Sequence, residues 1–61
     1  MKSYRITAIG FEGSEFVYEV DGDDTVTPQE ALLHVYGLHG QALARGDQDE
    51  PLGPQTTVEE I

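Results

Sequence analysis

The chain contains no cysteine and no tryptophan, and only three of its 61 residues are lysine or arginine. The absence of cysteine excludes disulfides and thiolate metal sites. No apolar run approaches the roughly 18 residues that a membrane-spanning helix needs, and the N-terminus leads into a polar–apolar alternation instead of an apolar leader. We therefore expect a cytoplasmic protein that does not contact a membrane.

Positive charge is absent from the whole middle of the chain. The only cations are Lys2, Arg5 and Arg45, against twelve Asp and Glu residues and a net charge of −9. Such a surface repels nucleic acid and anionic membranes, and it attracts basic proteins and cations. The expected partner is therefore a basic protein surface, with no direct binding of nucleic acid.

The short length limits both stability and function. A domain of 61 residues buries only about 60% of its unfolded surface, and such chains often gain stability from a disulfide, a metal or a partner subunit. With disulfides excluded, an oxygen-ligated cation, oligomerisation and a modest core remain. Enzymes of this size are rare because a pocket and its supporting residues need more scaffold, so we expect no catalytic activity.

Two segments alternate between polar and apolar residues, as β-strands do. They are residues 3–10 and 15–20, and the turn between them predicts a hairpin. A three-residue loop at 11–13, with Gly13 in the left-handed conformation, places both apolar rows on one face. The predicted pairs are Tyr4–Val20, Ile6–Tyr18 and Ala8–Phe16, with Arg5 opposite Glu19 on the other face.

A helix follows the hairpin and has a clear start. Thr27 is a good N-cap, Pro28 suits the first helical position, and Glu30 completes a capping box. An apolar stripe at helical spacing then faces the hairpin. It consists of Ala31, Leu32, Val35, Leu38, Ala42 and Leu43.

The end of the helix is less clear from the sequence. Because Gly37 and Gly40 weaken a helix interior, the helix ends either near Leu38 or at Ala44, before Gly46.

The composition changes after the helix. Residues 46–55 are polar and include two prolines and two glycines, which is typical of a disordered segment or linker. The last six residues could form a short third strand, a helical turn or a free end. The predicted fold class is α+β: a ββα domain at residues 1–45, in which the hairpin packs on one α-helix, and a disordered acidic tail at residues 46–61.

Residues 19–30 resemble the twelve-residue calcium loop of EF-hand proteins. The resemblance implies oxygen ligands at Glu19, Asp21, Asp23, Thr25 (through its carbonyl) and Glu30. The chain departs from that family because its first ligand is Glu, because Asp24 replaces the turn glycine, and because a strand precedes the loop. We favour the alternative of a turn followed by a capping box, in which Glu30 bonds the Thr27 backbone N–H and no metal is held.

No constellation of catalytic residues is visible. His34 and His39 are five residues apart, which does not place them on one helical face, whereas Glu30 and His34 are four apart and are expected to form a surface pair. Neither serine lies in a nucleophile elbow, and there is no Gly-rich phosphate loop.

Three segments together resemble small uncharacterised ββα proteins of phages and actinobacteria. They are Tyr4 to Ile9, Phe16 to Val20, and Thr27-Pro28-Gln29-Glu30-Ala31. Where such proteins have a known function, it is often to bind and block a host protein, so the resemblance implies a phage-type inhibitor.

The leading hypothesis is a small non-catalytic acidic protein that binds a basic partner. In its sharpest form it inhibits a nucleic-acid-binding protein by DNA mimicry, with carboxylates in place of phosphates. The predicted partner-binding residues are Glu12, Glu15, Glu19, Asp21, Asp23 and Asp24. The alternatives are a calcium-binding module and a homodimeric structural protein with Ile9 and Val17 at its interface.

Overall fold

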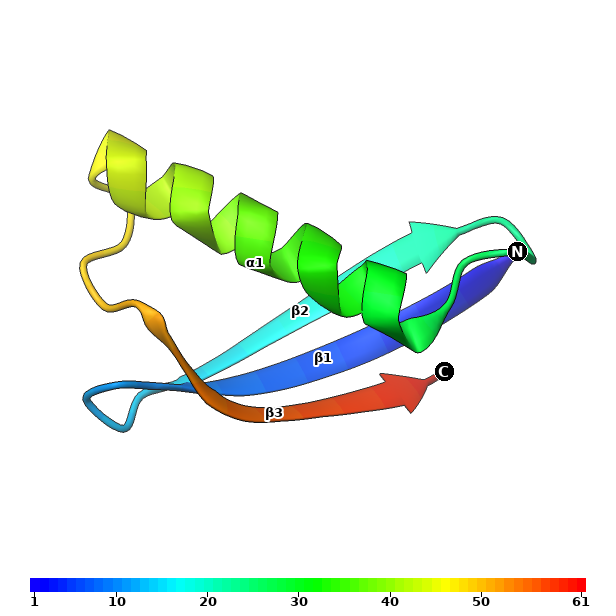
Figure 1. The fold of residues 1–61 in the computed structure, drawn as a ribbon, viewed down its shortest axis with the longest axis horizontal. Helices are drawn as coiled ribbons and strands as arrows, with labels where there is room; N and C mark the ends of the chain where they lie inside the picture. The colour runs from blue at the N-terminus through cyan, green and yellow to red at the C-terminus, as the bar shows by residue number, and fades with distance from the viewer.

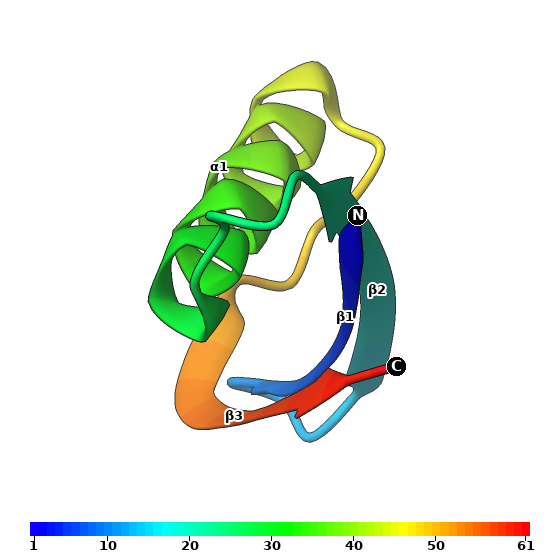
Figure 2. The same ribbon diagram turned by 90° about the vertical axis from the view of Figure 1, so that its right-hand side faces the viewer.

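The computed structural model describes all 61 residues as a three-stranded antiparallel sheet crossed by one helix. The elements in chain order are β1 (Lys2–Gly10), β2 (Glu15–Gly22), α1 (Pro28–Arg45) and β3 (Leu52–Glu60). The strand order is β2-β1-β3, so β1 is central and both other strands are edges. Figure 1 shows α1 lying across one face of the sheet, and Figure 2 shows that the opposite face has no covering layer. The predicted α+β class is confirmed.

The hairpin has the predicted register. Ala8 pairs with Phe16, Ile6 with Tyr18 and Tyr4 with Val20, and Arg5 lies opposite Glu19. Gly13 has a φ of 92°, and its N–H donates to the Gly10 carbonyl across the turn at 3.0 Å. Only glycine adopts this left-handed backbone at little cost, which explains why the three-residue loop closes here.

Helix α1 begins as predicted and ends late. The Thr27 hydroxyl accepts the Glu30 backbone N–H at 3.2 Å and donates to the Glu30 carboxylate at the same distance, so the carboxylate contacts the hydroxyl instead of the predicted Thr27 N–H. The helix continues through both internal glycines to Arg45, and Gly46 ends it with a φ of 83°.

The prediction of a disordered tail at residues 46–61 is wrong. Its second half forms β3, which pairs antiparallel with β1, with Val58 opposite Ile6 and Glu59 opposite Arg5. Of the three possibilities for the chain end, the short third strand is the one present. It begins at Leu52, earlier than the predicted residue 56.

Two tail residues that usually disfavour strands have places in β3. Proline is tolerated on edge strands, where a backbone N–H can face away from the sheet, and Pro54 lies in such a strand. Gly53 lies against β1 so closely that a Cβ there would come within 2.7 Å of the Ile9 carbonyl oxygen. The pairing register shifts at this point, between Ala8 and Gly10.

The core between α1 and the sheet is small, with nine of the 61 residues buried. Its central cluster is Tyr4, Ile6, Ala31 and Val35. Leu38 was predicted to face the sheet, but it is 40% exposed, and His39 occupies a buried position instead with 1% exposure. A histidine in the core needs polar partners, and these define part of the site described next.

Candidate functional site

All six predicted partner-binding carboxylates are exposed, and they follow one edge of the molecule. Three lie on the edge strand β2, and the other three lie in the turns that flank it. We call this set the acidic band: Glu12 in the β1–β2 turn, Glu15, Glu19 and Asp21 on β2, and Asp23 and Asp24 in the turn before α1. Because side chains alternate along a strand, the three on β2 share the sheet face away from α1.

Arg5 on the central strand contacts acidic residues on both sides. Its guanidinium lies 3.6 Å from the Glu19 carboxylate on β2 and 3.9 Å from the Glu59 carboxylate on β3. All three side chains are largely exposed, so these ion pairs add little stability. Glu59 extends the acidic surface across the sheet. The sequence did not place it there, because the conformation and the pairing of the last six residues were left open.

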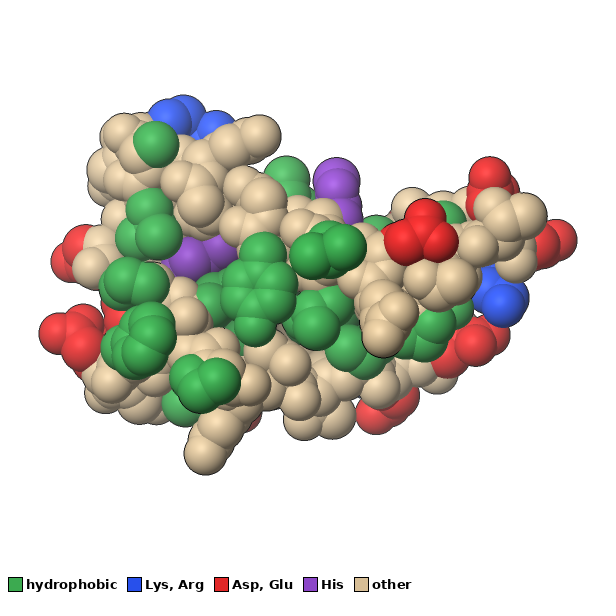
Figure 3. Space-filling model, viewed as in Figure 1, with side chains coloured by type: hydrophobic (Ala, Val, Ile, Leu, Met, Phe, Trp, Pro, Cys, Tyr) green, Lys and Arg blue, Asp and Glu red, His purple; other side chains and the backbone are tan.

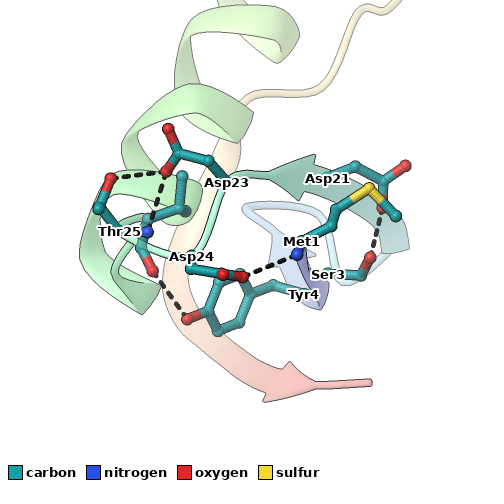
Figure 4. A network of polar contacts seen from close by, with 8 residues as sticks. Met1, Ser3, Tyr4, Asp21, Asp23, Asp24 and Thr25 are labelled. Atoms are coloured by element: carbon teal, nitrogen blue, oxygen red, sulfur yellow. Dashed lines mark hydrogen bonds and ion pairs between the residues drawn. The ribbon is translucent and has the colours of Figure 1, made fainter.

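The turn between β2 and α1 is held by its own carboxylates (Figure 4). Asp23 Oδ1 accepts the Thr25 hydroxyl at 2.6 Å and the Thr25 N–H at 2.9 Å. These bonds, the hydroxyl first, lower the pKa of Asp23. Asp24 binds the N-terminal ammonium at 2.7 Å, and Asp21 accepts the Ser3 hydroxyl at 2.6 Å. The end of the band next to α1 is therefore ordered by donors from Thr25, from the N-terminus and from Ser3 on β1.

The candidate calcium ligands do not converge on one point. Glu19 lies on the open sheet face beside Arg5, while the carboxylates of Asp23 and Glu30 are bonded to threonines that follow or precede them. The segment before the loop is strand β2, where an EF-hand has a helix. No group of three or more His, Asp or Glu side chains is arranged to hold a metal ion. Two of the candidate ligands, Asp21 and Glu30, both line a hollow of about 220 Å³ together with His34.

His39 lies at the centre of a hydrogen-bonded chain that the sequence did not reveal. Its Nδ1 lies 2.7 Å from the Tyr18 hydroxyl and its Nε2 lies 2.7 Å from the Glu50 carbonyl oxygen. Since a carbonyl only accepts, Nε2 must donate, and in the neutral ring Nδ1 then accepts from Tyr18. The Phe16 ring meets the imidazole edge-on, with centroids 4.8 Å apart.

Glu50 is a buried carboxylate that holds the hairpin turn. It is 5% exposed, and its Oε2 accepts the backbone N–H groups of Glu12 at 2.8 Å and Ser14 at 3.2 Å. Hydrogen bonding, above all with the Ser14 hydroxyl, lowers the pKa of Glu50, although burial opposes this shift. The segment that was predicted to be disordered thus contributes a structural anchor for the start of the acidic band.

No match to this chain was found among protein-family models, curated proteins or solved structures. The resemblance to small phage and actinobacterial proteins therefore stays a prediction. The single helix, α1, is not apolar enough along its length to cross a membrane.

Proposed function

We propose that this chain is a small non-catalytic interaction protein whose acidic band binds a basic surface of another protein. The observation that carries the proposal is the placement of six exposed carboxylates along one edge strand and its two flanking turns. Arg5 is the only Lys or Arg side chain that forms an ion pair with them.

The geometry suits recognition of a charged surface. A strand presents alternate side chains about 6.8 Å apart on one face, so Glu19 and Asp21 form a regular row on a backbone that the sheet holds rigid. Both turns beside the row are tied down, one through Glu50 and one through Asp23. A pre-ordered row of like charges steers a basic partner and loses little entropy on binding. A partner that uses the same basic surface for nucleic acid would be inhibited.

The test compares two variants of equal net charge. The band variant carries Glu15→Gln, Glu19→Gln and Asp21→Asn, and the control carries Asp47→Asn, Asp49→Asn and Glu60→Gln, which lie outside the band. Binding of a fluorescent oligolysine peptide is measured by anisotropy at several salt concentrations. We expect the band variant to bind at least about tenfold more weakly than the control and to show a smaller salt dependence. Equal losses in both would show that net charge alone attracts cations and that the band is not a site.

The inhibitory form of the proposal needs a second measurement. Wild-type protein and the band variant are compared as competitors against labelled DNA for a basic DNA-binding domain captured in a low-salt pull-down. Displacement of DNA by wild type but not by the variant is expected. Simultaneous binding of protein and DNA to the captured domain would contradict inhibition while leaving the interaction itself intact.

A calcium-binding module is the second candidate, favoured by the hollow that Asp21 and Glu30 share. It predicts saturable amide shifts confined to residues 19–30 when calcium is added, and their loss in Glu30→Gln. An unchanged amide spectrum at millimolar calcium would remove this candidate.

A further inference from the structure

The outer side of α1 and the segment leading into β3 form an apolar surface. Leu33 is 69% exposed and Tyr36 is 37% exposed, and next to them lies a hollow of about 200 Å³. The hollow is lined by Tyr36, His39, Gly40, Leu43, Pro51 and Leu52. Figure 3 shows hydrophobic side chains gathered over this side of the molecule, with acidic side chains near its ends. Between residues 31 and 44 the helix carries no Asp, Glu, Lys or Arg.

Two glycines in the same helix have no role within the monomer. A Cβ at Gly37 or Gly40 would meet no atom within 4 Å, and neither residue has a positive φ. Each glycine weakens the helix relative to alanine. Both glycines would be explained if this side of the helix contacted another helix, because the absence of a side chain allows the two backbones to approach closely.

We propose that this surface binds a second copy of the chain, with the two α1 helices antiparallel across a two-fold axis near residue 38. We call Leu33, Tyr36, Gly37, Gly40 and Leu43 the helix face. Leu33 and Tyr36 precede Gly40 and Leu43 by seven residues, which is two turns, so all four lie on one side of the helix.

The proposed axis makes the helix face complementary to itself. It places Leu33 opposite Leu43 of the other copy, and Tyr36 opposite Gly40. Leu33 and Tyr36 of each copy then pack against Leu43 and Gly40 of the other, at the hollow that Tyr36, Gly40 and Leu43 help to line. Both copies make the same contacts, as an isologous interface requires.

The distribution of charge selects a second copy in this orientation. Two chains of net charge −9 repel each other, and the helix face is a surface from which that charge is absent. Arg45 is paired with Asp47 of its own chain at 3.0 Å, so it is not counted as a contact across the interface. An antiparallel pair instead brings the C-terminal end of each α1 near the N-terminal end of the other, where the helix dipoles attract. The open sheet face is less suitable, because Glu15 and Glu19 flank Val17 there and would meet their own copies.

Dimerisation through the helix face would also stabilise a monomer whose own core is small. Five buried hydrophobic residues make a small core, and single cores in domains below about 70 residues often need support from a partner. The acidic band lies along β2, away from the helix face, so a dimer would leave two bands free. The inference is independent of the proposed function.

The test is sedimentation equilibrium from about 10 μM to about 1 mM, at low salt and at about 0.5 M salt. We expect a reversible dimer whose fraction rises with concentration and with salt, because salt screens the repulsion between acidic copies. Binding of a basic partner by the acidic band depends on salt in the opposite direction. A monomer mass under all conditions would overturn the proposal.

Three variants locate the interface. Leu33→Glu and Gly40→Gln should each raise the dissociation constant at least about tenfold. The helical circular dichroism of the monomer should stay intact, since both positions are exposed. Val17→Glu adds the same charge at an exposed apolar site on the other face and should leave the dimer unchanged. Loss of the dimer in Val17→Glu but not in Leu33→Glu would move the interface to the sheet and overturn the proposal.

The orientation is tested by NMR of the dimer. Within one helix Leu33 and Leu43 are ten residues, or about 15 Å, apart, too far for a methyl–methyl NOE. Such an NOE is therefore expected only between copies in the antiparallel arrangement. Contacts between Leu33 and its own symmetry mate would indicate a parallel pair and contradict this one.

Discussion

The Nε2 atom of His39 donates a 2.7 Å hydrogen bond to the backbone carbonyl of Glu50 and so ties the middle of α1 to the loop before β3. The side chain of Glu50 continues the connection to the hairpin turn, where it accepts two backbone N–H groups. Tyr18 on β2 bonds the other imidazole nitrogen. One chain of hydrogen bonds therefore joins helix, edge strand, loop and turn, and it anchors the start of the acidic band at the β1–β2 turn.

Replacing His39 by Ala should destabilise the protein severely. The change removes a ring that is 1% exposed and leaves the Tyr18 hydroxyl and the Glu50 carbonyl without their partner. Losses of this kind cost about 3 to 5 kcal/mol, which is comparable to the whole stability of a domain this small. Urea unfolding followed by circular dichroism measures the loss. His34→Ala is the control, because His34 is exposed, and it should change stability by no more than about 0.5 kcal/mol. Equal effects of the two variants would contradict this role for His39.

The local rules of hairpins and helices accounted for the first three quarters of the fold. The alternation of polar and apolar residues was enough to place Ala8 opposite Phe16. Any register shifted by one residue would have turned the apolar row of one strand away from the helix. Thr27 and Pro28 marked the helix start through capping chemistry that acts within one turn. In both cases the deciding interactions lie close together in the sequence.

The last strand could not be predicted because its stabilising contacts are distant in the sequence. Pro54 and Gly53 are usually signs of an irregular segment. Here the sheet edge tolerates the first, and the close approach of β1 requires the second. Only the position of β1 explains either residue, and that position is set by the rest of the fold.

The buried histidine escaped prediction because its partners also lie outside its own helix. His39 continues the row of Ala31 and Val35 at four-residue spacing, and this was the one available signal. This spacing alone does not predict burial, because a polar side chain is normally excluded from a core unless partners are present. Tyr18 comes from β2, and Glu50 comes from a segment whose composition predicts disorder.

The two kinds of glycine should respond to alanine with opposite signs. At Gly53 a Cβ would lie 2.7 Å from the Ile9 carbonyl oxygen, and since both are backbone atoms within a sheet, relief requires the strands to move apart. Gly53→Ala should cost about 1 to 3 kcal/mol. Gly37→Ala, where no atom lies within 4 Å, should stabilise the monomer by about 1 kcal/mol. Thermal unfolding of dilute samples measures both, and stabilisation by Gly53→Ala would contradict the close approach of β3 to β1.

Acid should lower the free energy of unfolding by protonating two carboxylates that are hydrogen-bonded in the folded state. Hydrogen bonds lower the folded-state pKa of Glu50, chiefly from the Ser14 hydroxyl, and that of Asp23, chiefly from the Thr25 hydroxyl. A depressed folded pKa gives stability that is present above the unfolded values, 4.5 for Glu50 and 3.8 for Asp23. That stability is lost as the pH falls through the folded values.

Glu50→Gln isolates one of these contributions. The variant should be less stable than wild type at neutral pH, and the two stabilities should converge on acidification to about pH 2, where the wild-type carboxylate is protonated. Glu60→Gln is a suitable control, because it removes the same charge from an exposed carboxylate on β3, and it should leave the stability at neutral pH close to that of wild type. Urea unfolding at a series of pH values provides the comparison. A constant difference between Glu50→Gln and wild type at all pH values would exclude ionisation of Glu50 as the cause.

Removing residues 50–61 should abolish the fold, although the sequence predicts an independent domain at residues 1–45. Without them β1 loses its partner along one side, and the core loses Leu52 and Val58. His39 also loses the Glu50 carbonyl. A two-stranded hairpin under one helix is marginal in water, so the fragment 1–49 should show weak helical circular dichroism and no cooperative unfolding. Adding the peptide 50–61 in excess should restore the helical signal by strand addition, and a peptide of scrambled order should not. A fragment 1–49 that unfolds cooperatively by itself would show that β3 is dispensable and that the first 45 residues form the stable unit.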